Sequence, residues 1–98
     1  MLFRSASSNG SSMYINIVFL SGTANVFSAA VTDILDYTNT NKYKTVRSLG
    51  GTETNTSGVI ELDSGLWLSV DPITSIRFEP DVGLFASNSR FSLYGIKG

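Results

Sequence analysis

The chain has 98 residues, a net charge of −1, and neither cysteine nor histidine. This length allows one domain with a small core, because such a chain buries roughly 65% of the surface that its unfolded form exposes. Without cysteine and histidine, disulfide scaffolds, thiolate zinc sites, thiol nucleophiles, Ser-His-Asp triads and the common zinc enzymes are excluded. The near-zero charge gives no basic footprint for nucleic acid. Charged residues make up 15%, so we expect a surface rich in Ser, Thr and Asn.

The N-terminal part predicts an arm followed by a strand. Residues 1–12 are expected to form a flexible Ser/Gly-rich arm or loop, since residues 5–12 are low in complexity. Tyr14–Leu20 predicts a buried strand rich in β-branched and aromatic residues. The alternative is a signal peptide with Arg4 as its charged region, but the apolar stretch is short for that role. It is also shorter than the ~20 residues that cross a bilayer, so no membrane partner is expected.

The next two segments predict a β-hairpin. Val26–Tyr37 could be helical, but its β-branched and aromatic residues favour a strand. Lys42–Leu49 predicts the second strand, which Gly50-Gly51 should stop, and the connection is a loop of Asn39, Thr40 and Asn41. We expect Asn41 to take the left-handed conformation of such a loop.

Charge patterning predicts the register of this hairpin, with partner residue numbers that sum to 80. The register places favourable cross-strand pairs opposite each other. These pairs are Val31 with Leu49, Asp33 with Arg47, Ile34 with Val46, Asp36 with Lys44, and Tyr37 with Tyr43.

The remainder predicts further short strands. Gly58–Leu62 and Leu66–Val70 would flank a turn at Asp63-Ser64-Gly65, after a polar loop over Glu53–Ser57. Asp71-Pro72 would break the chain. Ile73–Glu79 and Arg90–Ile96 would be strands, with Leu84 and Phe85 turned inward between them. Six or seven short strands with frequent turns predict an all-β fold, an antiparallel β-sandwich of the jelly-roll kind over residues 13–98.

Several of these stretches together carry a family resemblance. They are Asp33–Lys44 (DILDYTNTNKYK), Thr45–Gly51 (TVRSLGG), Ser64–Trp67 (SGLW), Ile73–Phe78 (ITSIRF) and the C-terminal SLYGIKG. The chain from about Thr23 to Gly98 resembles a family of structural virion proteins of marine and environmental bacteriophages, described as tail or fibre-like proteins. The resemblance implies a non-enzymatic protein made in the host cytoplasm and located in the virion. Its expected partners are other virion proteins.

One departure from the family pattern affects the expected assembly. Members of the family carry further strands before the matched region, with a motif of the kind HL-x-[IL]-R, and this chain lacks them. The chain would then supply only the C-terminal part of the sandwich, either because it is a fragment of a longer domain or because the missing strands come from elsewhere. Half a sandwich exposes an unpaired edge and an apolar face, so we expect a homo-oligomer, a trimer by analogy with such particles.

Three aromatic residues are candidates for contact with a host surface glycan or a partner protein. Trp67 could stack on a sugar ring, although packing between its neighbouring leucines explains it more simply. Tyr37 and Tyr43 could serve the same contact, although a cross-strand pair is the simpler interpretation. Tyr14 and Tyr94 are further candidates, for which packing in the core or an interface is the simpler interpretation.

No catalytic, cofactor-binding or metal-binding residue is predicted. The carboxylates considered for acid/base or calcium chemistry are Asp33, Asp36, Asp63, Asp71, Glu79 and Asp81. Asp33 and Asp36 would lie on opposite faces of a strand and do not form the pair that a glycosidase needs. The leading hypothesis is a tail fibre or adhesin-type module. The alternatives are a capsid decoration protein, and a carbohydrate-binding module or glycan depolymerase domain.

Overall fold

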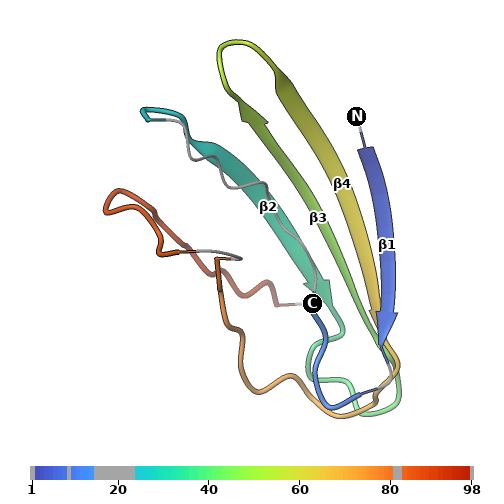
Figure 1. The fold of residues 1–98 in the computed structure, drawn as a ribbon. Coiled ribbons are helices and arrows are strands. Elements are labelled where there is room, and N and C mark those ends of the chain that lie inside the picture. Colours follow the sequence, from blue (N-terminus) through green and yellow to red (C-terminus); the bar gives the residue numbers. More distant parts are fainter. Residues whose placement is uncertain (1, 9, 15–23, 81–82, 98) are drawn as a thin grey trace.

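The computed structural model describes residues 2–8, 10–14, 24–80 and 83–97. Four strands form one sheet in the order β1-β4-β3-β2 (Figure 1). They are β1 (Leu2–Ser8), β2 (Ser28–Leu35), β3 (Lys44–Glu53) and β4 (Gly58–Trp67). Strands β2, β3 and β4 form an antiparallel meander, and β1 pairs parallel to β4. The described residues contain no helix, hence none that could cross a membrane. The predicted all-β class is confirmed, and the sheet is a single layer within the described residues.

The β2–β3 hairpin has the register that the charge pattern predicts. Val31 pairs with Leu49, Asp33 with Arg47 and Ile34 with Val46, so partner numbers sum to 80. The Arg47 Nε–H donates to Asp33 Oδ2 at 3.0 Å. Opposite charges and apolar side chains face each other across the two strands, which stabilises this register over a slip of one residue.

The connection between β2 and β3 differs from the predicted three-residue loop, because β2 ends at Leu35 and β3 begins at Lys44. The left-handed residue is Asp36, with φ 58°, and not Asn41. The Asn39 N–H donates to the Asp36 carbonyl oxygen at 3.0 Å, and the Asn39 side chain accepts from the Asn41 N–H at 2.8 Å. Lys44 Nζ donates to backbone carbonyls of this connection. The predicted Asp36–Lys44 pair is therefore wrong, since the lysine serves the turn.

Two predicted interruptions of the sheet are also wrong. Strand β3 continues through Gly50-Gly51 to Glu53, and β4 passes through Asp63-Ser64-Gly65 as one strand. Each segment lies opposite a paired strand, with Gly50 facing Glu61 and Gly65 facing Val46. Ladder hydrogen bonds on a central strand hold residues that would favour a turn in isolation.

The polar loop before β4 forms a tight turn. The Thr54 N–H donates to the Ser57 carbonyl oxygen at 2.8 Å, and the Thr54 hydroxyl donates to the same oxygen at 2.9 Å. Asn55 is left-handed, with φ 67°, and its N–H donates to the Glu53 carboxylate. Short polar side chains replace the missing ladder partners at this end of the sheet.

The N-terminal segment is a strand where an arm was predicted. Backbone pairing runs from Leu2 with Glu61 to Ser8 with Trp67, so the loop predicted over residues 5–12 is wrong for Ser5–Ser8. The parallel pairing covers the outer edge of β4 and requires only backbone groups, which a Ser-rich segment supplies. Most of the predicted Tyr14–Leu20 strand lies outside the described residues.

The C-terminal segment forms no strand over described residues 68–80 and 83–97, so the strands predicted at Ile73–Glu79 and Arg90–Ile96 are wrong. The Ile73 N–H donates to the Tyr37 carbonyl oxygen at 2.8 Å, which ties the segment to the end of the hairpin. Leu84 is 94% exposed, contrary to the predicted inward position, because it packs on no layer.

Three phenylalanine rings pack together within this C-terminal segment. Phe78 stacks on Phe91 with ring centroids 4.6 Å apart, and Phe85 meets Phe91 edge-on at 4.9 Å. Phe85 is half-buried in this cluster, as the predicted inward position requires. The rings hold the segment together by side-chain contact in place of a backbone ladder.

Candidate interaction surface

The sheet has one covered face and one open face. On β3 the buried residues alternate with exposed ones, as successive side chains of a strand must point to opposite faces. The cross-strand registers extend this alternation to β2 and β4. The covered face comprises Thr32, Ile34, Lys44, Val46, Ser48, Gly50, Glu61, Asp63 and Gly65, with the exposed Ala30 at its margin. The open face comprises Ala29, Val31, Asp33, Leu35, Thr45, Arg47, Leu49, Gly51, Glu53, Gly58, Ile60, Leu62, Ser64 and Leu66.

The open face is mostly aliphatic and accessible. Val31 is 71% exposed, Leu49 52% and Ile60 55%, and the pairing aligns Val31, Leu49 and Leu62 in one row across three strands. Isolated exposed aliphatic residues are ordinary, whereas a contiguous row marks an interaction surface. The Asp33–Arg47 ion pair, at 3.0 Å, lies beside this row on the open face.

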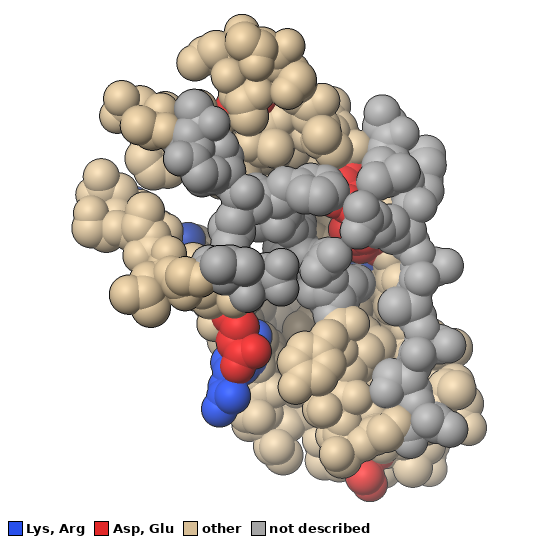
Figure 2. Space-filling model, viewed as in Figure 1, with Lys and Arg blue, Asp and Glu red and all other residues tan. Residues whose placement is uncertain are grey.

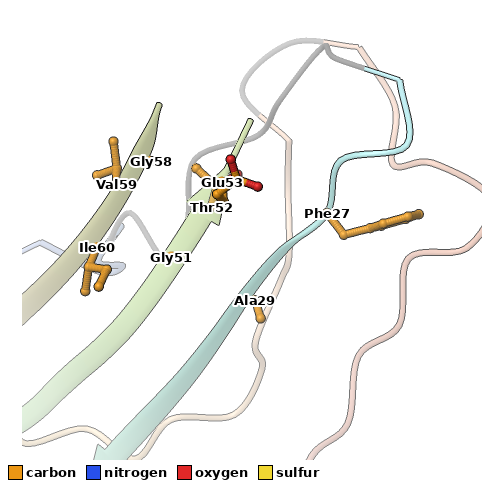
Figure 3. Close-up of a pocket in the computed structure, with 8 residues that line it drawn as sticks. All are labelled: Phe27, Ala29, Gly51, Thr52, Glu53, Gly58, Val59 and Ile60. Carbon is orange, nitrogen blue, oxygen red and sulfur yellow. The ribbon is translucent and has the colours of Figure 1, made fainter. Parts of the chain in front are cut away.

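A shallow hollow of about 580 Å³ lies at one end of the sheet. Figure 3 shows it at the end of the three strands, where Gly51 of β3 lies between Ala29 of β2 and Ile60 of β4. A Cβ added at Gly51 would lie 3.3 Å from the Val59 carbonyl oxygen, which is tighter than an ordinary contact. Glu53 is the one charged residue among those that line it, which are Phe27, Ala29, Gly51, Thr52, Glu53, Gly58, Val59 and Ile60. Such a lining suits an apolar side chain of a partner and offers no pair of catalytic groups.

The covered face carries two buried carboxylates, which were not predicted from the sequence to lie together. Glu61 is 2% exposed and Asp63 3%, and both lie on β4 two residues apart, with Cα atoms about 7 Å apart by strand geometry. Asp63 Oδ2 has no hydrogen-bond partner among the described residues. Arg4 of β1 is its register partner in the parallel pair. The turn predicted at residues 63–65 placed Asp63 outside the strand of Glu61. Alternation of side chains along an uninterrupted strand would have placed both carboxylates on one face.

These two carboxylates do not form an accessible catalytic site. A glycosidase pair must flank a sugar in an open groove, whereas both of these groups are buried. Neither lines the hollow at the end of the sheet. Beside them, the Thr32 hydroxyl donates to Ser48 Oγ at 2.9 Å, so the polar row also serves to connect β2 with β3.

The three aromatic candidates do not gather into one platform. The half-buried Trp67 donates its Nε1–H to the Gly10 carbonyl oxygen at 2.7 Å, which joins the end of β4 to the segment after β1. Tyr37 and Tyr43 are about half exposed in the β2–β3 connection. Over the described part of the chain, the ring contacts involve the three phenylalanines and none of these residues.

The other acidic candidates lie apart. Glu79 pairs with Arg77 at 2.9 Å, Asp36 lies 3.9 Å from Lys42 Nζ, and the Asp71 N–H donates to Ser69 Oγ at 3.1 Å. Asp81 lies outside the described residues. The described residues contain no group of three or more acidic, histidine or cysteine side chains suited to a metal ion.

Comparisons of the chain with protein-family models, with curated proteins and with solved structures each found no match.

Proposed function

We propose that this protein is a non-enzymatic structural protein of a bacteriophage virion, a tail fibre or adhesin-type module that works by packing against other virion proteins. In this proposal the sheet is one layer of a β-sandwich whose second layer is completed on assembly. The observation that carries the proposal is the open face, on which aliphatic side chains of three strands remain exposed. An apolar face of this kind is buried in a functional sandwich.

The exposed area of the whole chain supports a partner. A folded monomer of this mass exposes about 5,500 Å², whereas this chain exposes 7831 Å². Its radius of gyration is 14.7 Å, against about 12.6 Å for a compact domain of this length. The chain therefore has more unburied surface than a stable monomer of its size retains.

The character of the surface favours protein contact over sugar contact. The open face is aliphatic, and the indole N–H of Trp67 is already committed to Gly10. Stacking on sugar rings requires an exposed aromatic face, whereas the Trp67 side chain is half-buried. Figure 2 shows Lys, Arg, Asp and Glu in a few small groups, while most of the described surface in that view is uncharged. Weak charge suits dense packing in a particle, where like charges would repel.

Immunoelectron microscopy of purified phage particles that carry the chain tests this proposal, with antibody raised against the recombinant protein. We expect label on the tail or its fibres. Label distributed over the capsid shell would support the decoration alternative, and purified particles without label would contradict a structural role.

A glycan array separates protein contact from sugar contact. The wild-type chain, Trp67→Ala and Tyr37→Ala/Tyr43→Ala are compared, and we expect no saturable binding from any of them. Saturable binding that Trp67→Ala abolishes would assign the aromatic residues to a glycan receptor site instead.

A further inference from the structure

We propose that the open face packs against the same face of a second copy of this chain, so that the two sheets form the two layers of one sandwich. The inference deepens the proposed structural role and rests on it for its place in the particle. A twofold axis running along the strands, between β2 and β3, would place β2 of each copy over β3 of the other. The contact is isologous, because the same residues contribute from both sides.

The apolar part of the face is suited to this contact. Val31 and Leu49 are register partners within one copy, so the axis places Val31 of each copy over Leu49 of the other. Both are more than half exposed in the single chain. Two sheets that pack face to face bring such side chains together across a layer about 10 Å thick. Aliphatic residues that meet only solvent in one chain then meet each other.

The charged part of the face is self-complementary. Asp33 and Arg47 are also register partners, so the same axis places Asp33 of each copy opposite Arg47 of the other. Their side chains are 47% and 66% exposed, which leaves room for a second partner beside the internal ion pair. The row of Asp33 and Arg47 carries one charge of each sign, so two identical copies do not repel along it, while Glu53 adds a second carboxylate at the end of the same face. A face with a single sign of charge would exclude its own copy.

The whole chain exposes more area than a compact monomer of its mass. The chain exposes 7831 Å², more than about 2,000 Å² above the expectation for a monomer of its mass. A stable interface of standard size buries about 800 Å² on each partner. Part of this excess lies in the C-terminal segment, where Leu84 and Ile96 are 94% and 88% exposed, and the open face contributes Val31, Leu49 and Ile60 to it.

Sedimentation equilibrium of the purified chain is the first test, and we expect the mass of two copies in place of the trimer that analogy with such particles suggests. Val31→Lys/Leu49→Lys should give the mass of one copy while the far-UV circular dichroism of the sheet persists. The matched control is Leu84→Lys/Leu93→Lys, since these leucines are 94% and 79% exposed and lie outside the sheet. It should leave two copies. A wild-type mass of one or three copies, or a folded face variant that keeps two, would overturn the inference.

Cross-linking decides the geometry if the lysine variant does not fold. The chain has no native cysteine, so Leu49→Cys introduces a single thiol. A bis-maleimide with a spacer of about 10 Å, the distance between packed sheets, should link two copies of this variant. Ser92→Cys, placed in the C-terminal segment, should remain unlinked. Equal yields from the two variants would overturn the proposed face.

The outcomes separate this inference from the proposed function. A monomeric chain that still labels the phage tail would overturn the self-contact and leave the structural role standing. A two-copy chain that labels no particle would retain the self-contact and contradict the virion role.

Discussion

The meander β2–β4 and the C-terminal segment 68–97 carry similar sequence patterns but have different structures. Both alternate apolar with polar residues, yet β2, β3 and β4 form a continuous ladder while the described residues of the C-terminal segment form none. The meander strands follow each other through short connections, so each finds its partner nearby. Alternation of apolar and polar residues therefore shows only that a segment has one apolar and one polar face. A strand forms where a second strand is also available for backbone hydrogen bonds.

The two regions are also held by different forces. Backbone pairing on both sides fixes β3, whereas the C-terminal segment is held by the Ile73–Tyr37 hydrogen bond and the phenylalanine cluster. Figure 1 shows the segment as a long irregular trace beside the sheet. Substitutions that remove a backbone donor should therefore act on the sheet, and substitutions that remove rings should act on the segment.

The largest expected effect comes from a proline in the central strand. Thr45 of β3 pairs with Leu35 of β2 and with Leu66 of β4. Thr45→Pro removes its backbone N–H from the ladder and should lower the free energy of unfolding by about 3 kcal/mol. Ser92→Pro, in the segment without a ladder, should change it by less than about 0.5 kcal/mol. Urea unfolding followed by circular dichroism measures both. Equal losses in the two variants would mean that residues 90–97 also depend on backbone pairing.

Removing the shared ring should affect the C-terminal segment alone. Phe91→Ala abolishes both ring contacts, each of which contributes about 0.5–1.5 kcal/mol beyond burial. We expect faster proteolysis within residues 68–97, while hydrogen exchange of β3 stays unchanged. Leu93→Ala is the control, because Leu93 is mostly exposed. Faster exchange in β3 of Phe91→Ala would show that the cluster supports the sheet as well.

A smaller effect is expected at the link between β4 and the segment that follows β1. Trp67→Phe keeps a ring and removes the donor to Gly10, which should cost about 0.5–1.5 kcal/mol. Thermal unfolding measures the loss, and Tyr43→Phe, which removes a hydroxyl from a half-exposed residue, is the control. If Trp67→Phe were as stable as the wild type, the indole would be free for another role.

The smallest effect is expected from the Asp33–Arg47 pair. A double-mutant cycle with Asp33→Asn and Arg47→Met should give a coupling energy of about 0.2–1 kcal/mol, because both side chains are exposed. The cycle is measured under monomeric conditions, in the Val31→Lys/Leu49→Lys background, and the coupling should fall as salt is added. A coupling energy well above this range would indicate that the pair is buried by a contact even there.

The candidate surface was predictable only in part. The open-face residues Val31, Asp33, Arg47 and Leu49 follow from the predicted hairpin register. Ile60 and Leu62 did not join them, because the turn predicted at Asp63-Ser64-Gly65 separated β4 into two pieces. The same error hid the buried pair of Glu61 and Asp63 on the opposite face.

By itself the sequence determined the all-β class and the β2–β3 pairing, since complementary residues lie close along the chain and select one register. Only the tertiary structure decided that β1 pairs with β4 across more than fifty residues, and that the strands run on through Gly50-Gly51 and Gly65. It also decided which face of the sheet is covered. These outcomes depend on which segments compete for the same backbone edge, and local periodicity carries no information about that competition.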